Sequence, residues 1–184
     1  VYKRQVLNKK NKKEGIKMKK LLIIISLFMT CIFGFANAKP LDVDVTEGAK
    51  LPNFELRDFH GKYTKSKKLF GDGKPTLLIF AAEWCPYCQR ELADVQKFYE
   101  ENKDNINVVV VFTRRKTNLS ATKKYVEDSK FTFPVYYDAT NTLMTAFKVK
   151  TVPYNLIIQN SRIQKDLGGS KNYEELKEAF YLNY

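Results

Sequence analysis

Two short, uninterrupted apolar runs dominate the polarity pattern of the chain, TLLIFAA at 76–82 and INVVVVFT at 106–113. Runs of this length, rich in β-branched residues, predict buried strands. Between them, over 86–101, apolar residues recur every three or four positions, which predicts an amphipathic helix. Shorter extended segments are predicted at 54–57, 63–64, 131–138, 154–159 and 162–168.

Polar residues with capping ability predict where further helices begin. Asn118 or Ser120 can cap a helix that ends near Asp128, a short helix is expected over 141–147, and Asn172 with Glu175 forms the pattern of a capping box before the last helix. Strand and helix alternate, and two strands joined at 160–161 and a final helix follow. This order predicts an α/β fold in which helices flank a central mixed sheet, with an N-terminal β-hairpin as an extension.

The segment 18–38 has the layout of a secretory signal peptide. A basic start precedes an apolar run over 21–35, and the small residues Ala36 and Ala38 follow. The run has 15 residues, whereas a membrane-spanning helix needs about 20. We therefore expect cleavage after Ala38 and a location outside the cytoplasm, in the periplasm or cell envelope; the alternative is a retained anchor.

The remaining N-terminal organisation follows from this expectation. Residues 1–17 do not begin with Met, and their opening VYKRQ resembles a translated sequencing adapter, so we expect a gene-calling artefact before a true start at Met18. The alternative is a genuine basic N-terminal arm. Pro, Gly and alternating charges over 39–50 predict a flexible lead-in. Residues 51–184 are then one domain, large enough to bury a core of its own.

The net charge of +12 changes meaning once the N-terminal segment is set aside. The first 20 residues hold nine of the 32 basic residues and one of the 20 acidic residues, which leaves a net charge of +4 for the rest. A mildly basic domain does not indicate a nucleic-acid partner. The densest basic clusters, 62–68 and 113–116, are interpreted as solvated surface.

Cysteine usage indicates redox chemistry. With Cys31 in the predicted signal peptide, only Cys85 and Cys88 remain. A disulfide between them would close almost no loop and would stabilise the fold little. Cys85 is predicted at the N-terminus of a helix, where free N–H groups and the helix dipole favour a thiolate, and Pro86 suits the first helical position. We expect Cys85 to attack a disulfide and Cys88 to resolve the mixed disulfide.

Other uses of the two cysteines fit the sequence less well. A zinc site needs about four ligands, and only His60 joins the two cysteines as a soft ligand. A peroxidatic cysteine would have Thr or Ser three residues before it, where this chain has Ala82. A structural disulfide would contribute little. Neither a metal nor a bound cofactor is therefore expected.

The run LIFAAEWCPYC, followed by Thr151-Val152-Pro153, resembles the thioredoxin superfamily. The lead-in LPNFELRDFHGK and the acid at position 91 narrow the resemblance to the TlpA/ResA-like branch of extracytoplasmic thiol–disulfide oxidoreductases, over about residues 50–180. The resemblance implies a thioredoxin fold and a cis Val152–Pro153 bond that faces the active site, whereas from the sequence alone Pro153 could equally be a proline at the start of a strand. It also implies substrate binding by Trp84, Pro86, Tyr87, Val152 and Pro153.

Glu91 has two interpretations. It lies three residues after Cys88, on the same side of the predicted helix. A carboxylate there would manage the proton of Cys88 or raise the pKa of the thiols; the alternative is a solvated helix charge. Two departures from the family pattern affect redox chemistry: Ile79 stands where many thioredoxins have a buried Asp, and Pro86-Tyr87 is more typical of glutaredoxins.

The sequence thus predicts a monomeric, exported oxidoreductase that exchanges disulfides with protein substrates. The resemblance implies a reductase that receives electrons from a membrane thiol-transfer protein. The first alternative is a disulfide oxidase or isomerase, although a DsbA-type oxidase carries an inserted helical domain and only 64 residues separate Cys88 from Pro153. The second alternative is a non-catalytic binding module that uses the same groove.

Overall fold

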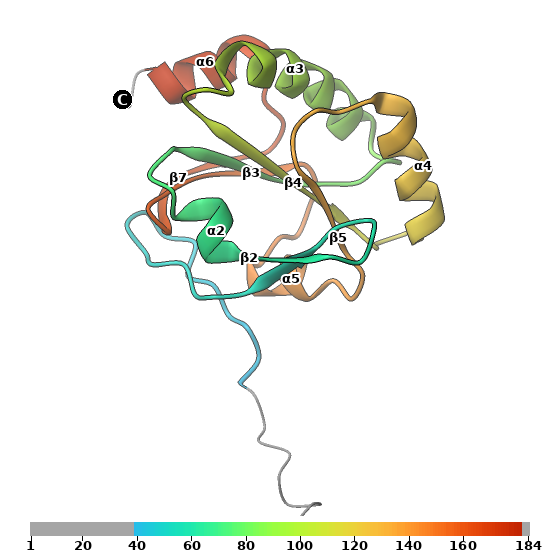
Figure 1. The fold of residues 1–184 in the computed structure, drawn as a ribbon, viewed down its shortest axis with the longest axis horizontal. Helices are drawn as coiled ribbons and strands as arrows, with labels where there is room; N and C mark the ends of the chain where they lie inside the picture. Colours follow the sequence, from blue (N-terminus) through green and yellow to red (C-terminus); the bar gives the residue numbers. More distant parts are fainter. Residues whose placement is uncertain (1–38, 182–184) are drawn as a thin grey trace, which may run out of the picture. The chain divides into compact units, whose positions relative to one another are not determined.

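The computed structural model describes residues 39–181, which form a five-stranded mixed sheet covered on both faces (Figure 1). The strand order is β5-β4-β3-β6-β7. The strands are β3 (Thr76–Ala81), β4 (Asn107–Thr113), β5 (Val135–Asp138), β6 (Tyr154–Gln159) and β7 (Arg162–Gly168). The first three run parallel, whereas β6 is antiparallel to β3 and β7 to β6. The predicted mixed sheet is confirmed.

Three helices cover one face of this sheet: α3 (Pro86–Asn102), α4 (Leu119–Ser129) and α6 (Tyr173–Tyr181). Alternate residues of β3 divide between the two faces, as the twofold period of a strand requires. Leu77 and Ile79 join the core under α3 and α6, and Leu78 and Phe80 join the core on the other side. Because both faces are covered, β3 is buried along its whole length, which explains its uninterrupted apolar sequence.

Smaller elements cover the second face. They are the antiparallel hairpin of β1 (Glu55–Arg57) and β2 (Tyr63–Lys65), and the helices α2 (Ser66–Phe70) and α5 (Thr142–Ala146). The hairpin was predicted and α2 was not. Five residues give too few turns for an apolar period to show, and the helix is held by the buried ring of Phe70.

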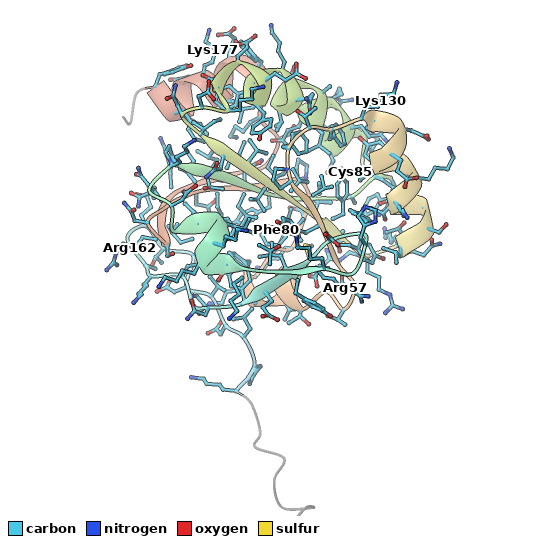
Figure 2. All side chains as sticks on the ribbon, in the orientation of Figure 1. Arg57, Phe80, Cys85, Lys130, Arg162 and Lys177 are labelled. Atoms are coloured by element: carbon cyan, nitrogen blue, oxygen red, sulfur yellow. The ribbon has the colours of Figure 1, made fainter. Side chains whose placement is uncertain are left out.

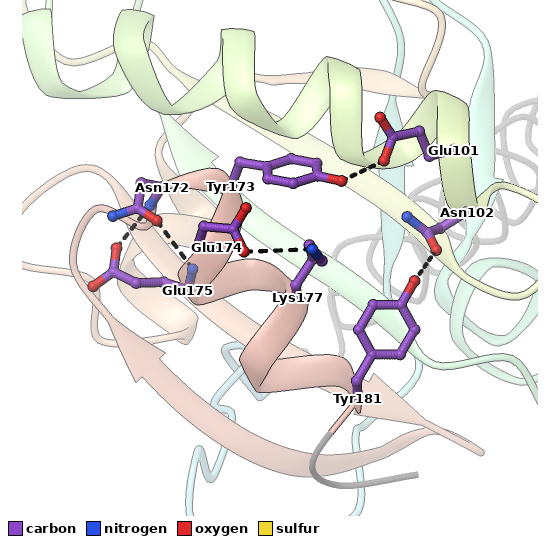
Figure 3. A network of polar contacts seen from close by, with 8 residues as sticks. All are labelled: Glu101, Asn102, Asn172, Tyr173, Glu174, Glu175, Lys177 and Tyr181. Carbon is purple, nitrogen blue, oxygen red and sulfur yellow. Dashed lines mark hydrogen bonds and ion pairs between the residues drawn. The ribbon is translucent and has the colours of Figure 1, made fainter.

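The predicted helix caps are present. Asn118 caps α4, and its Oδ1 accepts a hydrogen bond from the backbone N of Ala121 at 3.0 Å. Before α6, the backbone N of Asn172 donates to Glu175 Oε2 at 2.7 Å and the N of Glu175 donates to Asn172 Oδ1 at 3.0 Å, a complete capping box (Figure 3).

Polar contacts then join α6 to the C-terminal end of α3 (Figure 3). The hydroxyl of Tyr173 donates to Glu101, and that of Tyr181 donates to Asn102. Beneath them the rings of Phe98 and Phe180 pack with centroids 5.4 Å apart. These contacts fix the position of α6, and with it the segment just before α6, against α3.

Two segments differ from the sequence prediction. The strand expected over 131–138 is limited to β5, because the residues before Pro134 pack as a loop in which the rings of Phe131 and Phe133 stack 4.9 Å apart. The lead-in expected to be flexible over 39–50 packs on the domain: Val43 is fully buried and its N donates to the Ala146 carbonyl at 3.0 Å.

The expectations for residues 1–17 and 18–38 lie outside the described residues. Within 39–181, none of the helices has the length and apolar character needed to cross a membrane.

Candidate active site

Cys85 lies where the sheet meets the start of α3 (Figure 2). β3 ends at Ala81, and Cys85 is the N-cap of α3 with extended backbone angles, φ −89° and ψ 114°. Pro86 occupies the first turn, as predicted, and Cys88 lies one turn into the helix. Both side chains are free thiols; 5% of Cys85 and none of Cys88 is exposed. Cys85 is therefore the more accessible sulfur and has the helix N-terminus beside it.

The loop before β6 faces Cys85. The Val152–Pro153 bond is cis, as the resemblance implied, and Cys85 Sγ lies 3.5 Å from the carbonyl oxygen of Val152. The sheet brings these residues together, because antiparallel pairing of β6 with β3 sets Tyr154 opposite Phe80. The start of β6 and the end of β3 therefore lie side by side.

Two aromatic side chains next to the cysteines are exposed: 39% of Trp84 and 61% of Tyr87. Trp84 is held in place, since its Nε1 donates to the carbonyl of Arg115 at 2.7 Å. The predicted substrate-binding residues are chain neighbours of Cys85 (Trp84, Pro86 and Tyr87) or belong to the loop whose Val152 carbonyl contacts its sulfur (Val152 and Pro153), and their roles stay predictions.

Burial makes the thiol of Cys88 harder to ionise. The pKa of the Cys88 thiol is raised, mainly because burial penalises the thiolate. The neighbouring Cys85 side chain and the charge of Glu91 act in the same direction, whereas a backbone hydrogen bond at Ala82 opposes them. Cys88 is therefore a protonated thiol at neutral pH, and attack by it requires removal of its proton.

Glu91 is buried, with 1% of the residue exposed. Its Oε1 accepts hydrogen bonds from Asn155 Nδ2 at 2.8 Å and from the backbone N of Lys171 at 2.9 Å. Burial raises its pKa to about 7, although these two hydrogen bonds act to lower it. The interpretation as a solvated helix charge is therefore wrong, and the carboxyl group titrates near neutral pH, beside Cys88.

Asn155 is a site residue that the sequence analysis missed. It is fully buried in β6, and its Nδ2 also donates to the carbonyl of Gly169 at 3.0 Å. Within residues 39–181, Glu91 Oε2 and Asn155 Oδ1 are the buried side-chain polar atoms without a hydrogen-bond partner. The sequence did contain a signal: Asn155 is an amide inside the otherwise apolar strand YNLIIQ, and a buried polar side chain needs a hydrogen-bond partner.

Glu83 braces the turn that leads into the cysteines. Its carboxylate accepts hydrogen bonds from the hydroxyls of Thr117 and Thr122, and its backbone carbonyl accepts one from Gln89 Nε2. These contacts connect the turn to the loop after β4, to α4 and to α3. Cys85 is therefore presented on a segment that is tied to three neighbouring elements.

No group of three or more His, Cys, Asp and Glu side chains in residues 39–181 is arranged to hold a metal ion. The chemistry that the described residues support is thiol chemistry at Cys85 and Cys88, with one carboxyl group nearby.

Comparison with known proteins agrees with this geometry. The model of the AhpC/TSA family matches residues 48–165, well over half of the chain. The chain belongs to the AhpC/TSA family. This AhpC/TSA member has Ala82 three residues before Cys85 and a second cysteine one helical turn later, a pattern that favours disulfide exchange over peroxide reduction within the family.

Curated relatives of this AhpC/TSA member bear out its resemblance to ResA-like redoxins. Sporulation thiol-disulfide oxidoreductase A of Bacillus subtilis is 30% identical over 58% of this chain and 66% of its own length. Thiol-disulfide oxidoreductase ResA of Oceanobacillus iheyensis is 26% identical over 96% of this chain and 92% of its own length. The enzyme class expected from the sequence is the class that these relatives' names give.

The crystal structure of StoA from Bacillus subtilis shares the fold. It superposes with a TM-score of 0.60 at 27% identity and covers 69% of this chain and 95% of that chain. The expected thioredoxin fold, with its N-terminal hairpin, is confirmed.

Proposed function

We propose that this protein is an exported thiol–disulfide oxidoreductase that reduces disulfides in protein substrates through Cys85 and Cys88. One observation carries the proposal: Cys85 stands at the N-terminus of α3 with its Sγ 3.5 Å from the Val152 carbonyl. A sulfur at a helix N-terminus thus lies beside the backbone of the loop that precedes β6. The relatives named above support the same class of reaction.

The reaction follows from the different environments of the two sulfurs. The Cys85 thiolate attacks one sulfur of the substrate disulfide; a mixed disulfide forms, and the first substrate sulfur leaves as a thiolate. Cys88 then loses its proton and attacks Cys85 Sγ, which releases the second substrate thiolate. Two electrons pass to the substrate, and the protein is left with a Cys85–Cys88 disulfide.

Glu91 is the proposed acceptor of the Cys88 proton. It lies one turn after Cys88 on α3, and its negative charge acts on the Cys88 thiol. Its pKa of about 7 suits a group that takes up a proton near neutral pH and releases it again. Trp84, Pro86, Tyr87, Val152 and Pro153 are proposed to hold an extended substrate segment beside Cys85.

A reductase outside the cytoplasm needs a source of electrons. We propose a membrane thiol-transfer protein as the donor, by resemblance to ResA-like proteins, and export by the segment 18–38. The DsbA-type alternative loses support, because β4, α4, β5 and α5 occupy the chain between α3 and Pro153 and belong to the sheet and its covering.

Substitution of each cysteine tests the proposal. Cys85→Ser is expected to abolish reduction of insulin disulfides. Cys88→Ser is expected to accumulate mixed disulfides that are visible on non-reducing gels, because attack proceeds and resolution does not. Accumulation with Cys85→Ser and not with Cys88→Ser would reverse the roles. A reduction potential near −270 mV fits a reductase, and one near −120 mV would favour the oxidase.

A further inference from the structure

The basic cluster at 113–116 is built against the active site and is not simply solvated surface. The carbonyl of Arg115 accepts the indole hydrogen bond of Trp84 at 2.7 Å, and the Lys116 ammonium lies over the Trp84 ring, 5.5 Å from its centroid. The backbone of Lys116 is left-handed, with φ 60°. The loop therefore has a defined conformation next to Cys85.

Three further basic residues, Arg90, Arg115 and Lys150, belong to the same region. The guanidinium of Arg115 donates from Nη1 to the carbonyl of Lys150 at 2.7 Å, two residues before Val152. On the other side, the guanidinium of Arg90 lies 4.7 Å from the centroid of the Tyr87 ring. Cations therefore flank both exposed aromatic side chains and the loop that faces Cys85. We name Arg90, Arg115, Lys116 and Lys150 the cationic rim.

The charge of the cationic rim is not neutralised. All four residues are exposed, and none takes part in the ion pairs formed within residues 39–181. Two carboxylates lie close to the rim in sequence: Glu91, which follows Arg90 and is buried, and Glu83, which keeps its negative charge while it accepts hydrogen bonds from the hydroxyls of Thr117 and Thr122. The four basic residues next to Cys85 and Val152 outnumber these two carboxylates, which favours a positive local potential at the place where a substrate would dock.

We propose that the cationic rim selects protein substrates whose target disulfide is flanked by Asp or Glu. The proposal rests on the function proposed above and adds a substrate class to it. Complementary charge mainly accelerates encounter and fixes the orientation of the partner. An acidic segment laid across Trp84 and Tyr87 places its carboxylates beside the rim and its disulfide beside Cys85.

The test compares two disulfide-looped peptides that are identical except for Glu or Lys at the positions flanking the cysteines. Reduced full-length mature protein in excess reacts with each peptide in a single turnover, and acid-quenched samples are analysed for peptide thiols by mass spectrometry. We expect the Glu peptide to react about tenfold faster at low salt. The ratio should approach one when ionic strength rises from about 10 mM to about 1 M, as the Debye length falls from about 30 to about 3 Å.

Variants locate the effect. The double substitution Lys116→Gln, Lys150→Gln should lower the ratio to about threefold or less, since half of the rim charge is lost. Lys68→Gln is the control, because it also removes a lysine charge but lies in α2, away from Cys85. The hydroxyl of Thr76, at the start of β3, donates to the Leu69 carbonyl in α2, whereas Cys85 follows the end of β3. That control should keep the wild-type ratio.

Three results would overturn the inference: equal rates for the two peptides, an unchanged ratio in the rim variant, or an equal fall in the Lys68→Gln control. Hydroxyethyl disulfide, which is uncharged, separates this outcome from failure of the proposed function. If the wild-type protein does not reduce it, the reductase proposal itself fails. If it does and the peptides react equally, only the selection by charge fails.

Discussion

The buried carboxyl group of Glu91 gives a prediction with a definite sign. Burial raises its pKa from the ordinary 4.5 to about 7 in the folded protein. Between these two values the folded protein binds a proton that the unfolded chain has released, so the free energy of unfolding falls as pH rises. At about 1.4 kcal/mol for each pKa unit, the full effect is about 3 kcal/mol.

The perturbation is Glu91→Gln, which keeps the shape and removes the titration. The unfolding free energy of each reduced protein is measured by urea denaturation at several pH values between 5 and 8. The difference between wild type and variant should change by about 2.5 kcal/mol over this window, because pH 5 already lies above the unfolded pKa, and the wild-type protein should lose stability towards pH 8.

The same comparison removes the contributions of other groups. The pKa of Asp138 is also raised by burial, but Asp138 is present in both proteins and its effect cancels. If the two stability curves run parallel from pH 5 to pH 8, the carboxyl group is not held in a desolvated environment. The proposed role of Glu91 as acceptor of the Cys88 proton would then lose its basis.

The remaining predictions concern the partner of Glu91 and the processing of the chain. Asn155→Leu removes a donor to Glu91 Oε1 and to the Gly169 carbonyl; we expect a loss of about 1–3 kcal/mol in unfolding free energy and a Glu91 titration midpoint above that of wild type, both read from the same urea series. Unchanged stability would contradict the contact. N-terminal sequencing of protein from the cell envelope should begin at Lys39; a start before Ala36 would indicate a retained anchor.

The sequence predicted the strand end, the helix start and the helix caps around the site, because interactions between residues close together in the chain determine them. The apolar run 76–82 and the proline after Cys85 define the end of β3 and the start of α3 within a few residues. Asn118 and Asn172 cap the helices that they were expected to cap. Each of these features depends on neighbours along the chain, which the sequence displays directly.

The sequence also contained a signal that Glu91 is buried, which the sequence analysis did not use. Cys88, Glu91, Leu92, Val95 and Phe98 are the buried residues of α3, and they follow the spacing of three and four residues that marks one helix face. Glu91 falls inside this apolar face. The helical period that predicts burial of these apolar residues therefore predicts burial of the Glu91 carboxyl group as well.

The hydrogen-bond partners of Glu91 could not be predicted from the helical period. Asn155 lies 64 residues from Glu91 along the chain, and the Lys171 amide lies 80 residues away. The contact of the loop over 113–116 with Trp84 likewise joins residues far apart in sequence. Such contacts depend on strand order and register, and a periodic pattern specifies which face a residue occupies but not what lies opposite.

One strand pair sets both halves of the site. In the register of β6 on β3, Tyr154 faces Phe80 and Asn155 faces Ile79. The first pair brings Pro153 to Cys85, and the second turns the Asn155 amide towards α3 and Glu91. A slip by one residue would exchange the two faces of β6, so that Leu156 would point at Glu91 and the amide would enter the apolar core under α5. The loop that faces the attacking cysteine and the amide that holds the proposed proton acceptor are therefore positioned by the same register, and neither can be displaced without the other.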